Sequence, residues 1–220
     1  MNKKELNQQQ TELRRVMESG DHAQAIKFFL RQHAILHASA MAKARLWSYE
    51  DEILDGLDES QIRRIPQHEE HSILWCLWHI ARIEDVTMNL LIAKTNEVLE
   101  ERQWLVKLHA PIQHTGNAMT FDEVTDLSQR VDIAALLAYR TAVGRRTREI
   151  VTKLEPGTLH KKVDQAQIAR VAEKDVVHPD AYGIIDYWSK CTIAGLLLMP
   201  ASRHNLIHLN EAAQLKRKRK

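Results

Sequence analysis

The segment HSILWCLWHIARIED, residues 71–85, is apolar apart from its ends and a single histidine in its middle. On a helix of 3.6 residues per turn, its large apolar side chains and that histidine share one face, which must point into a core. The residues of this face are Trp75, Cys76, His79, Ile83, Val86 and Leu90. An imidazole is rarely buried without a partner, so His79 needs a hydrogen-bond acceptor or a metal ion.

A second group of histidines lies near the other end of the chain, in RHNLIHLNE, residues 203–211. His204 and His208 are four residues apart, which on a helix places them on one face, about 6 Å apart along the axis. Two such imidazoles can bind one metal ion. His33 and His37 form another pair with the same spacing, and spacing alone does not rank the two pairs.

The composition indicates one helical domain. A chain of 220 residues that is 44% hydrophobic and 27% charged can bury one sizeable core. Only seven glycines and five prolines interrupt it, and strong helix formers dominate, which predicts an all-α fold. We expect a single domain at residues 1–215, with a peripheral helix at 1–20, followed by a basic tail at 216–220.

Four long amphipathic helices are expected to form the core. They are predicted from about Ala23 to Trp47, from His71 to about Glu100, from Asp132 to Leu154, and from Tyr182 onward with a kink at Pro200. Short helices are expected in the connections, at 49–56, 58–64, 120–127 and 165–173. Long second and third connections between four such helices are typical of a four-helix bundle, in which metal sites lie between facing helices.

The charge pattern argues against a nucleic-acid-binding body. The tail Lys216 to Lys220 supplies five of the 31 basic residues, and the remaining 26 stand against 29 acidic residues. Nucleic acid is therefore an expected partner only through this tail, and we favour a solvated terminus as the explanation of the tail. Two cysteines cannot form a disulfide framework, and neither a signal peptide nor about 18 consecutive apolar residues occur, so we expect a soluble cytoplasmic protein.

Two segments resemble DinB/YfiT-like domains. The run LDGLDESQIRRIPQHEEHSILWCLWHIARIEDVTMNLL, residues 54–91, resembles the first half of that domain, and LLLMPASRHNLIHLNEA, residues 196–212, is similar to its fourth helix. The resemblance covers about Ala23 to Leu215. It implies a four-helix bundle that holds a divalent metal on three histidines, which by motif are His79, His204 and His208.

Three imidazoles would leave the metal with an open position, which is a catalytic rather than a structural pattern. Nickel, zinc, iron or copper all suit this ligand set. Several neighbouring residues are candidates for a role at this site. Cys76 could be a further ligand or an unreactive thiol. Glu84, Asp85 and Asn210 could contact the ligands. Glu211 is the candidate catalytic base, but it could also orient a ligand or form a surface ion pair, which we favour.

The remaining histidines, His33 and His37, match no family motif firmly. They could line the pocket, add a fourth ligand or pack in the core, and we favour packing.

Two functions follow from these observations. The first is a metal-binding DinB-like protein acting as a metal-dependent hydrolase or a thiol S-transferase, since relatives of this fold include enzymes that use low-molecular-weight thiols. The second is a non-enzymatic, stress-related interaction protein whose basic tail contacts nucleic acid. We expect a homodimer in either case. The sequence does not indicate the substrate.

Overall fold

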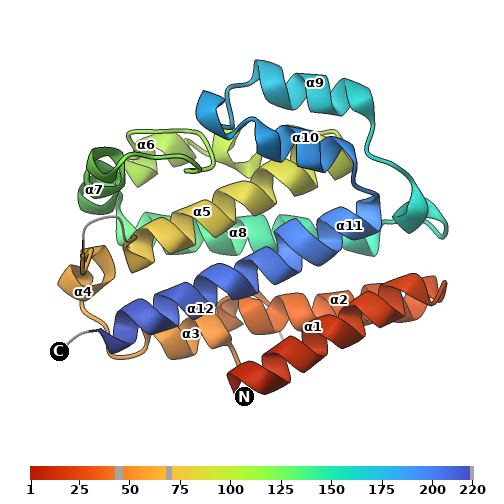
Figure 1. Cartoon of the computed structure of the whole chain (residues 1–220), viewed down its shortest axis with the longest axis horizontal. Helices are drawn as coiled ribbons and strands as arrows, with labels where there is room; N and C mark the ends of the chain where they lie inside the picture. The colour runs from red at the N-terminus through yellow and green to blue at the C-terminus, as the bar shows by residue number, and fades with distance from the viewer. Residues whose placement is uncertain (43–46, 68–70, 219–220) are drawn as a thin grey trace.

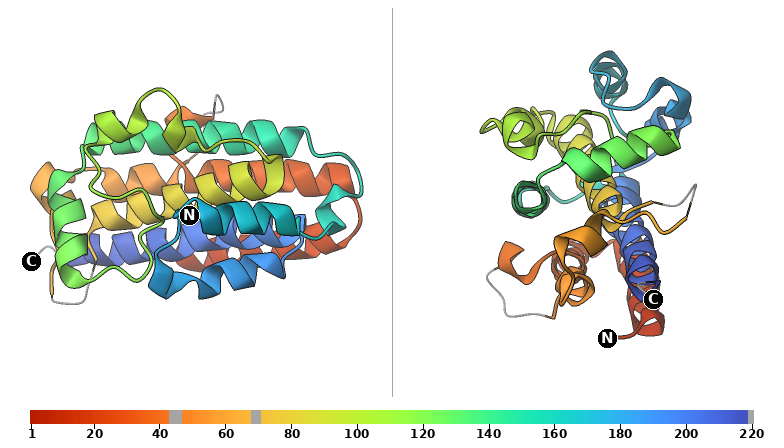
Figure 2. Two further views of the ribbon diagram at one scale, coloured as in Figure 1. Left: turned by 90° about the horizontal axis from the view of Figure 1, so that it is seen from above. Right: turned by 90° about the vertical axis from the view of Figure 1, so that its left-hand side faces the viewer.

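The computed structural model describes residues 1–42, 47–67 and 71–218, and within them the chain is all-helical without a β-strand. Four long helical units form a bundle (Figures 1 and 2). They are α2 (His22–Leu36), α5 (Ile73–Asp85) with a π-helical continuation at Val86–Ala93, α8 (Ile133–Thr152), and α11 (Ile193–Leu198), which passes through a π-helical segment at Met199–Arg203 into α12 (His204–Arg217). The predicted all-α four-helix bundle is confirmed.

Helix α5 is the centre of this arrangement. It packs against α8 and α12, which run alongside it (Figure 1). Every residue of α5 is buried, and the side chain of Ser72 caps its first turn by accepting a hydrogen bond from the Trp75 amide. Since the helix also carries charged residues, each of these needs a partner inside the protein.

The first two core helices end earlier than predicted. The first ends at Leu36 rather than at Trp47, because His37 has an extended backbone; residues 43–46 of the predicted range lie outside the described part. The second ends at Ala93 rather than at Glu100, because Lys94 adopts the left-handed conformation (φ 59°) that commonly ends a helix.

The fourth core helix begins later than predicted. Residues after Tyr182 form a separate short helix, α10 (Gly183–Ser189), which packs against α9 (Gln165–Glu173). A new N-cap at Thr192, whose hydroxyl accepts from the Gly195 amide, then starts α11. The prediction of one continuous helix from Tyr182 was therefore wrong.

Pro200 does not break the helix. The chain continues through it as the wider π-helical turn of Met199–Arg203, which is compatible with the missing N–H of proline.

Further helices surround the bundle. Helix α1 (Lys3–Glu18) lies along α2 at the edge of the bundle and buries Leu13, Val16 and Met17 (Figure 1). The others are α3 (Tyr49–Leu54), α4 (Glu59–Arg63), α6 (Trp104–Leu108), α7 (Phe121–Arg130), α9 and α10. None of the described helices is long and apolar enough to cross a membrane.

The basic tail starts inside the last helix. Lys216 and Arg217 belong to α12, and the Lys216 ammonium donates hydrogen bonds to the carbonyls of Glu52 and Asp55. Residues 219–220 of the predicted tail lie outside the described part.

Candidate metal centre

The structure brings His79, His204 and His208 together between α5 and α12. Their ring centroids are 4.6–4.8 Å apart, and each ring offers one nitrogen within 4.8 Å of the other two. Two segments 125 residues apart in the chain thus present three imidazoles to one point. The group could hold a metal ion.

Hydrogen bonds fix the tautomers of two of these rings. His79 donates from Nδ1 to the carbonyl oxygen of Thr115 (2.6 Å), and His208 donates from Nδ1 to a carboxylate oxygen of Glu211 (2.8 Å). Because both partners only accept, each ring carries its proton on Nδ1 and keeps a lone pair on Nε2. The Nε2 atoms of His79 and His204 are 3.1 Å apart.

The protein environment keeps two of the three imidazoles, those of His79 and His204, neutral. Burial lowers the pKa of His79 to about 3, and the nearby His208 adds to the effect. Burial and the other two rings also hold the pKa of His204 well below its usual value. Neutral imidazole is the form that binds a metal ion.

The cluster opens on the α12 side. His79 is buried, whereas His204 and His208 are both partly exposed. A ligand could therefore approach the three nitrogens from this side. The π-helical turn at Met199–Arg203 ends immediately before His204 and sets the rotation at which α12 presents its histidines.

Glu211 links the cluster to the surface. Besides accepting from His208, it accepts from Nδ1 of His71 (2.7 Å), whose side chain is about one-third exposed. Burial alone would raise the pKa of Glu211, but the hydrogen bonds from His208 and His71 outweigh it and lower the pKa to about 2. Glu211 thus pairs with the partly exposed His71 at the surface, as favoured, and it also orients His208.

Trp75 and Cys76 form the apolar wall next to these groups. The Trp75 ring stacks on His71 (centroids 3.5 Å apart) and on His79 (4.6 Å). Cys76 is fully buried beside His208 and Glu211, and burial, together with the Glu211 charge, raises the pKa of its thiol well above the usual value. Cys76 is therefore a protonated thiol rather than a thiolate.

The loop between α6 and α7 holds His79 in place. Three consecutive carbonyls of this loop bind α5: Gln113 accepts from Nε of Arg82 (2.9 Å), His114 accepts from the Trp78 indole (3.2 Å), and the next residue, Thr115, accepts from His79. The orientation of His79 therefore depends on this loop.

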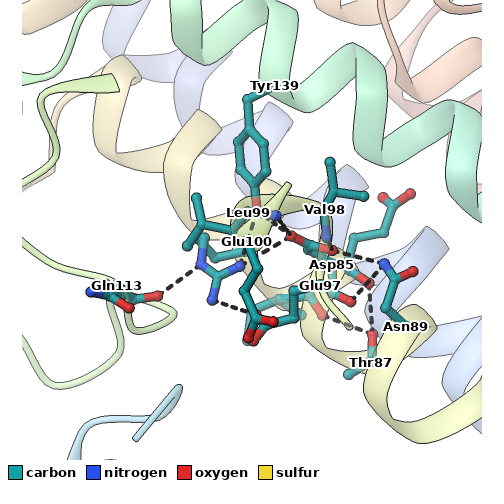
Figure 3. Close-up of polar contacts among 12 residues, drawn as sticks. Asp85, Thr87, Asn89, Glu97, Val98, Leu99, Glu100, Gln113 and Tyr139 are labelled. Carbon is teal, nitrogen blue, oxygen red and sulfur yellow. Dashed lines mark hydrogen bonds and ion pairs between the residues drawn. The ribbon is translucent and has the colours of Figure 1, made fainter. Parts of the chain in front are cut away.

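Arg82 belongs to a buried polar network with Asp85, Glu97, Gln113 and Tyr139, which are labelled in Figure 3. Its guanidinium donates to Asp85 (3.2 Å), Glu97 (2.6 Å) and the Tyr139 hydroxyl (3.0 Å) as well as to Gln113. The network connects α5 with Tyr139 of α8, with Glu97 in the segment that follows the π-helical continuation of α5, and with Gln113 in the loop before α7. Arg82 and Tyr139 are completely buried, so its charges cannot be compensated by solvent.

Asp85 was expected near the metal ligands, and this was wrong. Its carboxylate accepts from the amides of Val98 and Leu99 (2.8 and 3.0 Å) and from Asn89 and Tyr139 (Figure 3). It anchors the chain segment that follows α5.

Among the described residues, neither Glu84 nor Asn210 forms a hydrogen bond with the three histidines, although the Glu84 charge acts on the pKa of His204. Asn210 accepts a hydrogen bond from Tyr49 (3.0 Å), and Glu84 binds His33 and His37. These last two histidines are buried, as favoured, and they form a separate group with Glu84 instead of adding a fourth ligand or lining the candidate centre.

Comparison with known proteins agrees with this architecture. The sequence profile of the DinB superfamily matches residues 44–179, a range that includes His79 but ends before His204 and His208. Among curated proteins, none matches the chain significantly.

A solved structure, the crystal structure of the conserved protein of locus from Enterococcus faecalis, is similar with a TM-score of 0.61 and 16% sequence identity. The match covers 89% of this chain and 95% of that one. This similarity concerns the fold.

Proposed function

Because the chain belongs to the DinB superfamily, we propose that it binds a divalent metal ion through His79, His204 and His208 and acts as a metal-dependent enzyme. The observation that carries the proposal is the orientation of the rings. Two of the three are held by hydrogen-bond acceptors in the tautomer that turns the Nε2 lone pair toward the common point.

The ligand set favours a catalytic site over a structural one. Three neutral imidazoles leave at least one position open, and the partly exposed side of the cluster gives access to it. Zinc, nickel and iron fit these ligands. When bound, the metal supplies Lewis acidity that can activate a small nucleophile.

The residues around the centre restrict the reaction type. The nearest thiol, Cys76, is buried and protonated, so the protein offers no cysteine nucleophile here. The nucleophile would therefore come from solution, as water in a hydrolase or as a small thiol in a thiol S-transferase. Glu211, ionised and accepting hydrogen bonds from both His208 and His71, would orient the His208 ligand rather than take up a proton.

Metal analysis of protein made without an affinity tag tests the proposal. Wild-type protein is expected to contain stoichiometric metal, and His79→Ala is expected to lose one equivalent. His160→Ala is the matched control, because His160 is exposed and outside the cluster. Equal metal content in wild type and His79→Ala, both folded by circular dichroism, would reject the metal site.

Activity screening separates the two reaction types. A hydrolase would turn over ester, amide or phosphoester substrates without added thiol, whereas a thiol S-transferase would require one. Either activity should be absent in His204→Ala. It should also be lost from wild-type protein after metal removal and return when the metal is added back.

A further inference from the structure

A second group of potential ligands lies in the core of the bundle. His33 Nε2 is 2.8 Å from one carboxylate oxygen of Glu84, and His37 Nε2 is 3.0 Å from the other. Thr147 donates to the first oxygen (2.7 Å) and Asn205 to the second (2.9 Å). These residues come from α5 and α8, from α2 with the residue that follows it, and from α12, so every unit of the bundle contributes.

All these side chains are inaccessible to solvent. The side chains of His33, His37 and Glu84 are at most 1% exposed, and one ligand atom from each lies within 4.8 Å of the others. Helix α8 closes the site from one side, because Gly144 brings its backbone against the His37 ring. The group is therefore completely enclosed.

The carboxylate of Glu84 lacks a fixed cation. Its pKa is held well below the usual value despite burial, because His37 and His33 surround it, so the group is ionised. Burial lowers the pKa of His37 to about 3, which makes that ring neutral. Among the described residues, no Lys or Arg pairs with Glu84; the neighbouring Arg140 binds Glu50 instead.

The two imidazoles are also incompletely bonded. The Nδ1 atoms of His33 and His37 have no hydrogen-bond partner in the described structure, so each is free to carry the ring proton when Nε2 binds a cation. A buried carboxylate with no Lys or Arg partner among the described residues, next to two imidazoles, is an environment that a bound cation would stabilise.

We propose that His33, His37 and Glu84 form a second metal site, which takes a first-row divalent cation such as zinc. Ligand atoms about 2.1 Å from a tetrahedral zinc ion lie about 3.4 Å apart, so the present nitrogen–oxygen separations need only a small outward shift. Binding requires the proton on each imidazole to move from Nε2 to Nδ1, and the ion neutralises the Glu84 charge.

This site differs in kind from the three-histidine centre. It is closed to solvent, so an ion there would have no path to a substrate, and it joins the end of α2 to α5. Its function would be to stabilise the bundle. It does not depend on the catalytic function proposed for the other centre.

The experiment uses a full-length variant in which the open centre is removed, His204→Ala with His208→Ala. The untagged protein is stripped with a chelator and titrated with Zn²⁺, and with Co²⁺ as a spectroscopic probe. Wild type is expected to bind two equivalents and the variant one, and Zn²⁺ is expected to raise the melting temperature of the variant. A folded variant that binds no stoichiometric Zn²⁺ and shows no change in melting temperature would overturn the proposal.

A further substitution assigns the remaining equivalent. Adding Glu84→Gln keeps the side-chain size but removes the anionic ligand, and the equivalent should be lost. The matched control is Glu149→Gln, at an exposed position on α8. If the Glu84→Gln protein retained the ion, the site would lie elsewhere and the proposal would be wrong. If that protein did not fold, the titration of the His204→Ala, His208→Ala variant would decide.

Discussion

Replacement of Glu211 by alanine tests how the candidate centre is held. The substitution removes the only acceptor of the His208 Nδ1 proton that the structure shows, an ionised oxygen at 2.8 Å. Without it, the His208 ring is free to rotate and to exchange tautomers, and the metal-binding form has to be selected on binding. Loss of such an outer hydrogen bond typically weakens metal affinity about 10- to 100-fold.

This factor corresponds to about 1.4–2.7 kcal/mol of binding free energy. The other hydrogen bond lost, from His71, involves a side chain that is one-third exposed and can bind water instead, so it should contribute little. Glu211→Gln should lose less affinity than Glu211→Ala, because the amide oxygen can still accept from His208.

Zinc affinity measured by competition with a chelator of known affinity is the appropriate assay. Glu12→Ala is the matched control, since Glu12 forms an exposed ion pair with Arg15 on α1. The affinity of the control should equal that of wild type. If Glu211→Ala bound zinc within twofold of wild type while remaining folded, the hydrogen bond would not position His208 and the reasoning would be refuted.

Three further predictions concern the scaffold. Arg82→Met leaves two buried carboxylate partners unpaired and should lower the free energy of unfolding by about 3–5 kcal/mol in urea denaturation; a loss below 1 kcal/mol would contradict the role of the network. Gly144→Ala places a methyl group 2.8 Å from a buried imidazole nitrogen, and this clash, about 1–3 kcal/mol, should outweigh the helix-propensity gain. Gly183→Ala meets no atom within 4 Å and should not destabilise, so equal stability of the two variants would count against the clash. A thiol reagent should modify Cys191, which is partly exposed, in the native protein and Cys76 only after denaturation, so rapid native labelling of the Cys191→Ser variant would show that the buried thiol is accessible.

Local signals in the sequence predicted the fold well. Asp58 and Thr120 begin helices as expected, and Glu123 completes a capping box with Thr120, because these bonds form between residues three positions apart. The helix around Gln165 to Glu173 also lies where the pattern placed it. Helix ends determined by longer-range contacts were predicted less well, as at Leu36.

At the candidate site, too, side-chain motifs were predicted well and contacts made by distant backbone were not. The convergence of His79 with His204 and His208 was expected from motif resemblance, and the geometry agrees with it. The sequence could not show that a backbone carbonyl, that of Thr115, orients His79, since every residue type carries a carbonyl.

Two charged residues of α5 were also misjudged. Arg82 was not singled out, and Asp85 was assigned to the wrong neighbourhood. Their spacing of three residues within a helix that is otherwise apolar was the available signal for a buried ion pair.

The wide turn before His204 makes the centre depend on how the helix winds as well as on residue identity. A π-helical turn accommodates one more residue than an α-helical turn. If the same five residues Met199–Arg203 wound as an unbroken α-helix, everything downstream would be rotated by about 100° about the helix axis. Both imidazoles of α12 would then turn away from α5 although no ligand had been replaced, so the geometry of the centre depends on this wider turn.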